Sequence, residues 1–266
     1  MNESQIVFPE SRGLAKSCKF YFARLNRIFG DERMKLDVCI ATRIEKMPNL
    51  EAMLIDSGVP YDQIFIDSSE TLLAKKRENL IKRVGTNNFI FLDDDVFLPK
   101  GWYENIMKFW DEKLAWLEGY ANPSKPEWYA KWCEYRLGTV TPYYIAKGER
   151  GFLCSTIIKT DYVSDFLAPP SMSYAEDWAL SKHVQSKGGK MYRVPVRSYH
   201  NFTYNLFDHT RTSTKMMRKY VPWTTQLKQA AVSVASGLKC AVATSDFEVA
   251  AGAIHLSYEM IAGTLF

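Results

Sequence analysis

Three consecutive aspartates at the end of a short apolar run are the residues of this chain best suited to chemistry. Asp93, Asp94 and Asp95 directly follow the apolar residues 89–92. Clustered carboxylates repel one another, and burying any of them without a partner is costly. A divalent cation is the simplest compensation, and carboxylate oxygens suit Mg²⁺ or Mn²⁺, which bridge to substrate phosphates. The cluster predicts a metal-assisted site for a phosphorylated substrate. An acidic loop that caps the next helix is the alternative.

A second group of reactive side chains lies further along the chain. Glu176 and Asp177 stand near the start of a predicted helix over residues 173–187, and His200 follows a predicted strand. A carboxylate within reach of a reacting hydroxyl can serve as a general base, and an imidazole can bind Mn²⁺. Acids in a first helical turn also stabilise the helix dipole, and a lone histidine is often structural. The residues alone leave both interpretations open.

The elements that must position these residues alternate between strand and helix. Short apolar runs predict strands over 36–41, 63–66, 89–92, 151–160 and 191–196, and the segments between them predict helices over 49–57, 71–83, 102–116 and 173–187. This order favours a mainly parallel sheet covered on both faces, with ligands at the carboxyl ends of its strands. Residues 120–144 are less regular and dense in aromatics, which either stack on an acceptor or fill the core.

We divide the chain into three parts. Residues 1–34 form an N-terminal extension, 35–214 the catalytic domain and 215–266 a C-terminal helical region. In the extension, residues 12–29 have basic side chains on one helical side and apolar ones on the other, which predicts an amphipathic helix. Such a helix lies on an anionic membrane surface or packs on the domain, and the pattern supports both. The C-terminal helices pack on the domain, on another subunit or at a membrane.

Composition limits the possible classes of protein. The 266 residues are 47% hydrophobic with a net charge of +4, so the total charge gives no sign of nucleic-acid binding. The five cysteines are scattered, which disfavours structural zinc or a disulfide framework. The first residues lack a basic start followed by an apolar core, and no stretch reaches 18 apolar residues. These features predict a cytoplasmic protein, either free or peripheral at a membrane surface.

Taken in order, four segments resemble the GT-A glycosyltransferases, most closely the family 2 group that transfers sugars from nucleotide donors. They are DVCIATRIE, IFIDSSE, FIFLDDDVFLPKGW and YAEDWALSKHVQSKGGKMYRVPV, and the likeness covers roughly residues 35–204. The third is similar to the family's D-x-D element and the fourth to its E-D helix. Arg77 lies sixteen residues before Asp93, as does the arginine of the family's Ala-Arg-Asn triplet, although Glu78 stands in place of the asparagine.

The resemblance implies a role for each matching residue. Asp177 matches the catalytic base, and Glu176 would orient the acceptor or the base. A metal, Mn²⁺ or Mg²⁺, would be held by Asp93, Asp95 and His200. The donor-binding residues implied are Thr42, Arg43, Glu45, Asp67, Arg77, Asp93 and Asp94.

The fold and activity implied are those of the family. We expect an α/β, Rossmann-like GT-A sheet flanked by helices, with the N-terminal amphipathic helix and the C-terminal helical tail added to it. The expected enzyme is a metal-dependent, inverting glycosyltransferase. It would move a sugar from a nucleoside-diphosphate sugar of the UDP or GDP type to a hydroxyl of a glycan or lipid-linked acceptor. Two alternatives are a nucleotidyltransferase and a non-catalytic nucleotide-sugar-binding protein on the same scaffold.

Overall fold

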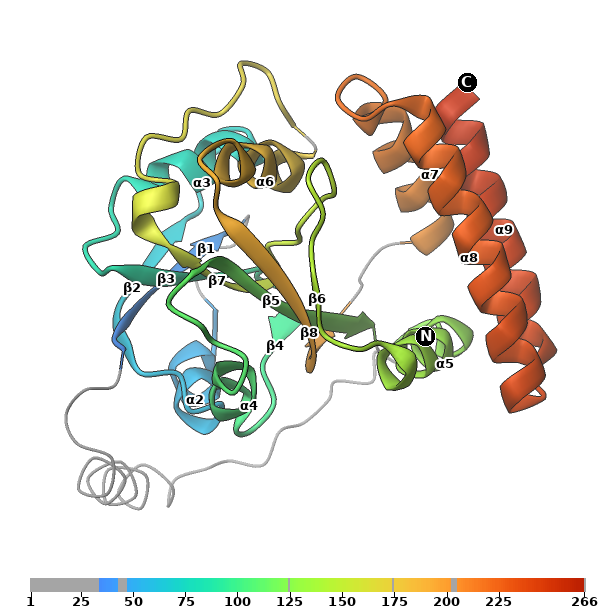
Figure 1. The fold of residues 1–266 in the computed structure, drawn as a ribbon, viewed down its shortest axis with the longest axis horizontal. Coiled ribbons are helices and arrows are strands. Elements are labelled where there is room, and N and C mark those ends of the chain that lie inside the picture. The colour runs from blue at the N-terminus through green and yellow to red at the C-terminus, as the bar shows by residue number, and fades with distance from the viewer. Residues whose placement is uncertain (1–33, 43–46, 124, 174, 202–204, 266) are drawn as a thin grey trace. The chain divides into compact units, whose positions relative to one another are not determined.

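The computed structural model describes residues 34–42, 47–123, 125–173, 175–201 and 205–265 (Figure 1). The chain divides into two units, residues 1–34 and 35–266, and the predicted amphipathic helix over 12–29 lies outside the described residues. The strands are β1 (Leu36–Ala41), β2 (Tyr61–Asp67), β3 (Asn88–Leu92), β4 (Val96–Phe97), β5 (Leu114–Pro123), β6 (Tyr143–Tyr144), β7 (Ser155–Lys159) and β8 (Lys190–His200). The helices are α2 (Leu50–Asp56), α3 (Leu73–Ile81), α4 (Trp102–Met107), α5 (Glu127–Thr139), a 3₁₀ turn η1 (Thr160–Tyr162), α6 (Glu176–Ser186), α7 (Leu206–Met217), α8 (Trp223–Thr244) and α9 (Phe247–Leu265).

The strands of the second unit form one mixed sheet in the order β2-β1-β3-β7-β5-β8-β4, with β6 added on β8. β1 is parallel to β2 and β3, and β5 is parallel to β8. β7 lies antiparallel between β3 and β5 and joins these parallel groups. The predicted α/β sheet flanked by helices is therefore confirmed.

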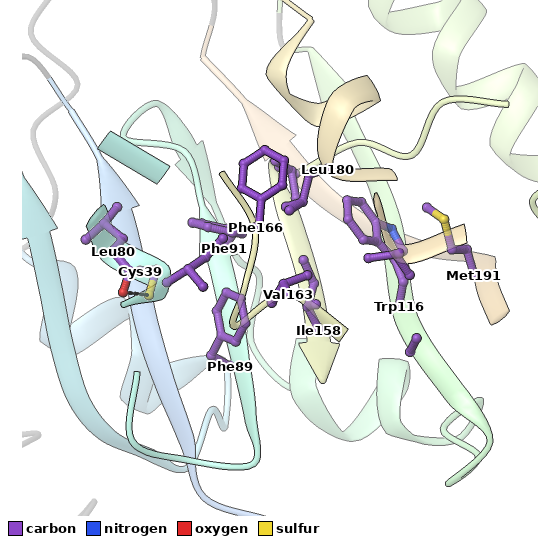
Figure 2. Close-up of a cluster of buried hydrophobic side chains, with 14 of the residues drawn as sticks. Cys39, Leu80, Phe89, Phe91, Trp116, Ile158, Val163, Phe166, Leu180 and Met191 are labelled. Atoms are coloured by element: carbon purple, nitrogen blue, oxygen red, sulfur yellow. Dashed lines mark hydrogen bonds between the residues drawn. The ribbon is translucent and has the colours of Figure 1, made fainter. Parts of the chain in front are cut away.

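Alternating side chains on the central strands build the two layers around the sheet. Phe89 and Phe91 of β3 pack with Leu80 of α3 and Leu180 of α6 in one buried cluster (Figure 2). The side chains between them on β3 point to the opposite face because strand residues alternate. Figure 1 shows α2 and α4 on that opposite face. Burial on both faces explains why β1 and β3 read as continuous apolar runs.

The helix predicted over 102–116 is wrong in its second half. α4 ends at Met107, and the chain turns at Asp111, whose carbonyl accepts a hydrogen bond from the Leu114 N–H at 2.8 Å. β5 begins there and runs to Pro123, with Ala115 and Trp116 fully buried. An apolar run of this length fits a buried strand as well as a buried helix, and here the place between β7 and β8 decides the outcome.

The C-terminal helices pack on one another and on α5. Trp132 of α5, Cys240 of α8 and Val249 of α9 belong to a second buried cluster, separate from the cluster under the sheet. α7 begins earlier than the predicted helical region, at Leu206, because Asn205 caps its first turn by accepting from two backbone N–H groups. Among the described helices, none is both long and apolar enough to cross a membrane.

The α8–α9 contact predicts a sharp response to one added methyl group. A Cβ at Gly237 would lie 2.1 Å from the Cβ of Ala253, so Gly237→Ala forces the two helices apart. We expect a loss of about 1–3 kcal/mol in the free energy of unfolding. Gly138→Ala in α5 is the control, because no atom of the described residues lies within 4 Å of its added Cβ, and it should gain up to about 1 kcal/mol. Urea unfolding of both variants measures the difference, and equal stability would contradict the tight contact.

Candidate active site

Three of the residues that the resemblance predicts to bind a donor lie together at the carboxyl ends of three adjacent strands. Thr42 follows β1, Asp67 ends β2 and Asp93 follows β3. The Thr42 hydroxyl donates to Asp94 Oδ2 at 2.5 Å. This bond ties the end of β1 to residues 93–95, which we call the aspartate turn. The carboxyl ends of parallel strands are where open α/β sheets bind ligands. The strand order thus places the predicted donor residues at one edge.

The Asp67 carboxylate is held in place by hydrogen bonds and can accept further ones. Its Oδ1 accepts from the N–H and the hydroxyl of Ser69 at 3.0 and 2.5 Å, and its Oδ2 accepts from Asn79 at 3.4 Å. Partial burial raises the pKa of Asp67, but these hydrogen bonds outweigh that effect and lower it overall. An ionised carboxylate at this strand end can accept hydrogen bonds from a base or ribose.

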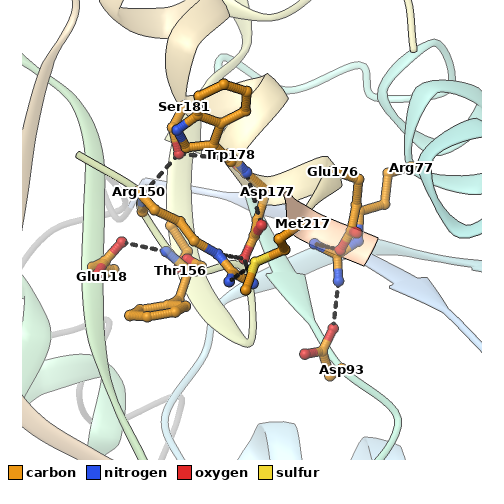
Figure 3. A network of polar contacts seen from close by, with 12 residues as sticks. Arg77, Asp93, Glu118, Arg150, Thr156, Glu176, Asp177, Trp178, Ser181 and Met217 are labelled. Carbon is orange, nitrogen blue, oxygen red and sulfur yellow. Dashed lines mark hydrogen bonds and ion pairs between the residues drawn. The ribbon is translucent and has the colours of Figure 1, made fainter. Parts of the chain in front are cut away.

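Arg77 is the central cation of the site. It comes from α3, is buried, and its Nη2 donates to Asp93 Oδ1 at 2.9 Å (Figure 3). Its Nη1 lies 3.3 Å from Glu176 Oε1, and the guanidinium sits over the ring of Phe91. Burial lowers the pKa of Arg77, but the surrounding carboxylates, Glu176 first, raise it overall. One arginine thus links the aspartate turn to the start of α6.

The carboxylates that face Arg77 are difficult to ionise. Burial raises the pKa of Glu176 more than Arg77 lowers it, and Asp177 adds to the rise. Desolvation likewise raises the pKa of Asp93 despite Arg77, with a further contribution from Asp95. Several acids forced close together in a poorly solvated place are typical of functional sites.

His200 reaches the aspartate turn through strand pairing. β4 pairs with β8 so that Val96 lies opposite His200, and the Asn201 N–H donates to the Asp95 carbonyl at 2.8 Å. The His200 Nε2 then lies 2.9 Å from Asp95 Oδ1. Within the described residues, no three Asp, Glu, His or Cys side chains form a group that could already hold a metal. The Asp93 carboxylate is bound by Arg77. Asp95 and His200 are the pair that the structure brings together.

Asp177 is paired with an arginine that the sequence did not indicate. Arg150 donates from Nε to Asp177 Oδ2 at 2.7 Å, and its Nη2 lies 2.6 Å from the same oxygen (Figure 3). Its Nη1 contacts the Met217 sulfur at 3.1 Å, so the end of α7 borders this pair. Ala175, just before Glu176, adopts a left-handed φ of 62°, an unfavourable conformation for alanine that turns both acids into the site.

A buried ion pair supports the segment that carries Arg150. Glu118 of β5 pairs with Arg193 of β8, and Glu118 Oε2 also accepts from the Phe152 N–H at 2.8 Å. Arg193 Nη2 donates to the Arg150 carbonyl at 3.0 Å. Burial raises the pKa of Glu118, against the lowering effect of Arg193. These contacts hold residues 150–152 against β5 and β8, beside α6.

The structure brings most of the predicted residues together. Arg77 links Asp93 to Glu176, Thr42 binds Asp94, and Asp95 binds His200. Arg43 and Glu45 lie outside the described residues. The sequence interpretation missed Arg150, Glu118 and Arg193, because each finds its partner 27 or more positions away. The sequence carried no local signal for these partners, since no strand was predicted at Glu118.

No protein-family model matches the sequence, and no curated protein matches it. Solved structures do. S. aureus TarS aligns with 83% of this chain and 55% of its own, with a TM-score of 0.50 and 11% identity. S. aureus TarS 1–349 in complex with UDP aligns over 86% and 90%, with a TM-score of 0.48 and 12% identity. A197 from STIV aligns over 63% and 85%, with a TM-score of 0.41 and 18% identity.

The match to S. aureus TarS, with a TM-score of 0.50, defines the class of fold. The chain has the GT-A fold, as its motifs predicted, and it spans about half the length of S. aureus TarS. At this level of identity the likeness is one of fold, so the activity has to be argued from the site itself.

Arg77→Met tests the central ion pairs. The change leaves Asp93 and Glu176 without their shared cation, which should lower the free energy of unfolding at pH 7 by about 3–5 kcal/mol. The folded pKa values of both acids are already raised and should rise further. The folded state then binds more protons than the unfolded state above the ordinary carboxyl range, so stability falls as pH rises through that window. The defect should therefore shrink at pH 5.

Arg83→Met is the matched control, because Arg83 is exposed in the turn that follows α3 and stacks on Phe65. Denaturant unfolding of both variants at pH 5 and pH 7 gives the comparison. An Arg77→Met defect that is small, or the same at both pH values, would contradict the proposed electrostatic link.

Proposed function

We propose that this protein is a glycosyltransferase that uses a nucleoside-diphosphate sugar. One observation supports this most directly. Arg77 ties the aspartate turn after β3 to the acid pair that starts α6. A transferase needs a site for the donor diphosphate beside a base for the acceptor. The aspartate turn would supply the first and the acids of α6 the second, and Arg77 joins the two. The GT-A fold agrees with this assignment.

On the donor side, the three strand ends would hold the nucleotide. Asp67, with its lowered pKa, would bind the base or ribose, and Thr42 with Asp94 would line the neighbouring strand end. Arg77 Nη1 is buried 3.3 Å from Glu176 Oε1 and has no hydrogen bond to the residues that the structure describes, so we propose that it donates to a ligand oxygen. The donor type that we propose is a UDP- or GDP-sugar, following the motif resemblance.

Asp95 and His200 fit a divalent cation. A carboxylate oxygen and an imidazole nitrogen 2.9 Å apart are suitable ligands for Mn²⁺, while Mg²⁺ favours the oxygen alone. Asp93, next to this pair, would contribute through its carboxylate or bind the ribose. When bound, the ion supplies neutralisation of the charge that develops on the diphosphate leaving group.

The transfer step that we propose is a single displacement with inversion. Asp177 accepts the proton of the acceptor hydroxyl while the hydroxyl oxygen forms a bond to the anomeric carbon. The bond from that carbon to the diphosphate oxygen breaks, and its electron pair leaves with the nucleoside diphosphate. Arg150 pairs with Asp177 and holds its carboxylate in place, and Glu176, held by Arg77, orients the acceptor.

The acceptor that we propose is a glycan or a lipid-linked sugar. Two exposed aromatic rings contact Arg150, the partner of Asp177, or Arg193, which binds the Arg150 carbonyl, and they support a sugar ligand. Phe152 is 42% exposed and lies under both Arg150 and Arg193, and Tyr143 is 36% exposed and accepts from Arg193. Rings of this kind stack on the apolar faces of sugars. The basic pattern over residues 12–29 supports work at an anionic membrane surface from the cytoplasmic side.

A donor screen tests the proposal. The protein is incubated with Mn²⁺ or Mg²⁺ and with UDP-, GDP- and dTDP-sugars, and release of nucleoside diphosphate is followed. Turnover of one donor is expected. Asp177→Asn should lower kcat by about 10²- to 10⁴-fold while the protein still binds nucleotide, because only the base is lost. Asp95→Ala should weaken metal and nucleotide binding together.

Asp161→Asn is the control, since Asp161 is exposed in the 3₁₀ turn away from these residues and should leave turnover unchanged. Nucleoside triphosphate turnover with release of pyrophosphate would instead identify a nucleotidyltransferase. Nucleotide-sugar binding without turnover across glycan and lipid-linked acceptors would identify a binding protein.

A further inference from the structure

The outer side of α9 carries a line of apolar side chains that the described part of the chain leaves uncovered. This line, the α9 row, consists of Phe247, Ala251, Ile254, Tyr258, Ile261 and Leu265, and all six are exposed. Phe247 is 86% and Tyr258 60% exposed. The spacing of four, three, four, three and four residues keeps the row on one side of the helix. Contiguous apolar surface of this kind marks an interaction site on a soluble domain.

The fold itself does not need the α9 row. The opposite side of α9 buries Val249, Leu256 and Gly263, spaced seven residues apart. This inner side holds α9 on its neighbours: Gly263 lies against the Arg211 backbone of α7, and Ala253 faces Gly237 of α8. α9 therefore has two apolar sides, and intramolecular packing accounts for one of them.

We propose that the α9 row binds the same row of a second copy of this chain, with the two α9 helices antiparallel about a two-fold axis at position 256. In such an interface the same patch serves on both copies, so it must be complementary to itself. The row meets this condition. Pairing positions at equal distances from 256 sets Phe247 against Leu265, Ile254 against Tyr258, and the small Ala251 against the large Ile261.

The size of the surface suits a dimer. α9 has 19 residues and is about 28 Å long at 1.5 Å per residue. Leu238 and Val242 of α8 are also exposed and add a second helix to the apolar surface, which Figure 1 shows running beside α9. Two helices, each about 10 Å across, give roughly 600 Å² per copy. A total near 1,200 Å² is at the lower end of stable interfaces.

The charges favour a second copy over a lipid surface. Helices that lie on anionic membranes carry Lys or Arg beside their apolar side. α9 contains neither, and its acids are Glu248 and Glu259. Glu259 is held inward by an ion pair with Arg211. α8 carries two exposed lysines, Lys228 and Lys239, and Lys239 is next to Leu238 at the α8 edge of the surface, so the α9 row itself has no basic side chain on its own helix.

The first test measures mass in solution. Sedimentation or light scattering of the full chain should show a dimer that dissociates on dilution. The double variant Ile254→Asp, Tyr258→Asp places charges at the centre of the row and should raise the dimer Kd by at least about 100-fold. Leu167→Asp is the control, because Leu167 is a 71% exposed apolar residue outside the helices, and it should leave the dimer intact. Unchanged circular dichroism confirms that each variant is folded.

The second test checks the antiparallel register. Positions 251 and 261 lie about 15 Å apart on one helix, beyond the reach of a disulfide of roughly 7 Å between Cα atoms. The proposed axis sets position 251 of one copy against 261 of the other. A chain carrying both Ala251→Cys and Ile261→Cys should therefore form a covalent dimer on oxidation, and chains with either change alone should not.

A chain that stays monomeric, or a dimer that survives the double aspartate variant, overturns the proposal. A monomer that floats with vesicles of phosphatidylcholine and phosphatidylglycerol overturns it as well and shows that the row meets lipid. None of these measurements depends on the proposed transferase activity, so the two ideas fail separately.

Discussion

The site depends on one buried cation. Arg77 places a guanidinium between carboxylates from two segments far apart in the chain, the turn after β3 and the start of α6. Removing these charges from water is costly, and the mutual attraction compensates only when all partners are present. α3, β3 and α6 are therefore fixed relative to one another by electrostatics as well as by the apolar cluster beneath them. The positive charge of Arg77 therefore contributes to the electrostatic potential at the aspartates, where a ligand would bind.

The sequence could predict the local features of the site but not the contacts between distant segments. The strand ends, the aspartate turn and the spacing from Arg77 to Asp93 are local features, because each lies within one strand–helix repeat. The metal chemistry of the aspartates could be inferred from the residue types and their place after a strand, whereas the role of Arg77 came from the family resemblance. The pairing of Arg150 with Asp177, and of Glu118 with Arg193, depends on how distant segments meet in the sheet. No local pattern marks such partners, so the sequence could not identify them.

The failed helix over 102–116 has a related cause. Residues 114–117 are an apolar run that suits a helix or a buried strand equally, and only the sheet provides the deciding partners β7 and β8. β8 in turn carries His200 to Asp95 through its pairing with β4. Because the sequence prediction placed residues 114–116 in a helix, it lacked β5, the strand that pairs with β8 and positions it. The expectation that His200 serves the site came from motif resemblance, and its position beside Asp95 follows from the sheet pairing.

In the C-terminal helices, helical spacing of apolar residues fits both packing within the chain and contact with a partner. Apolar residues on α9 follow helical spacing on both its inner and its outer side, and the sequence cannot show which of them the chain itself buries. The structure assigns Val249, Leu256 and Gly263 to the inner contact. The remaining apolar side has the spacing of any stripe along one side of a helix, so its spacing alone does not select a partner. The fit of the small Ala251 opposite the large Ile261, together with the lack of Lys and Arg on α9, is the physical ground for assigning the outer side to a second copy.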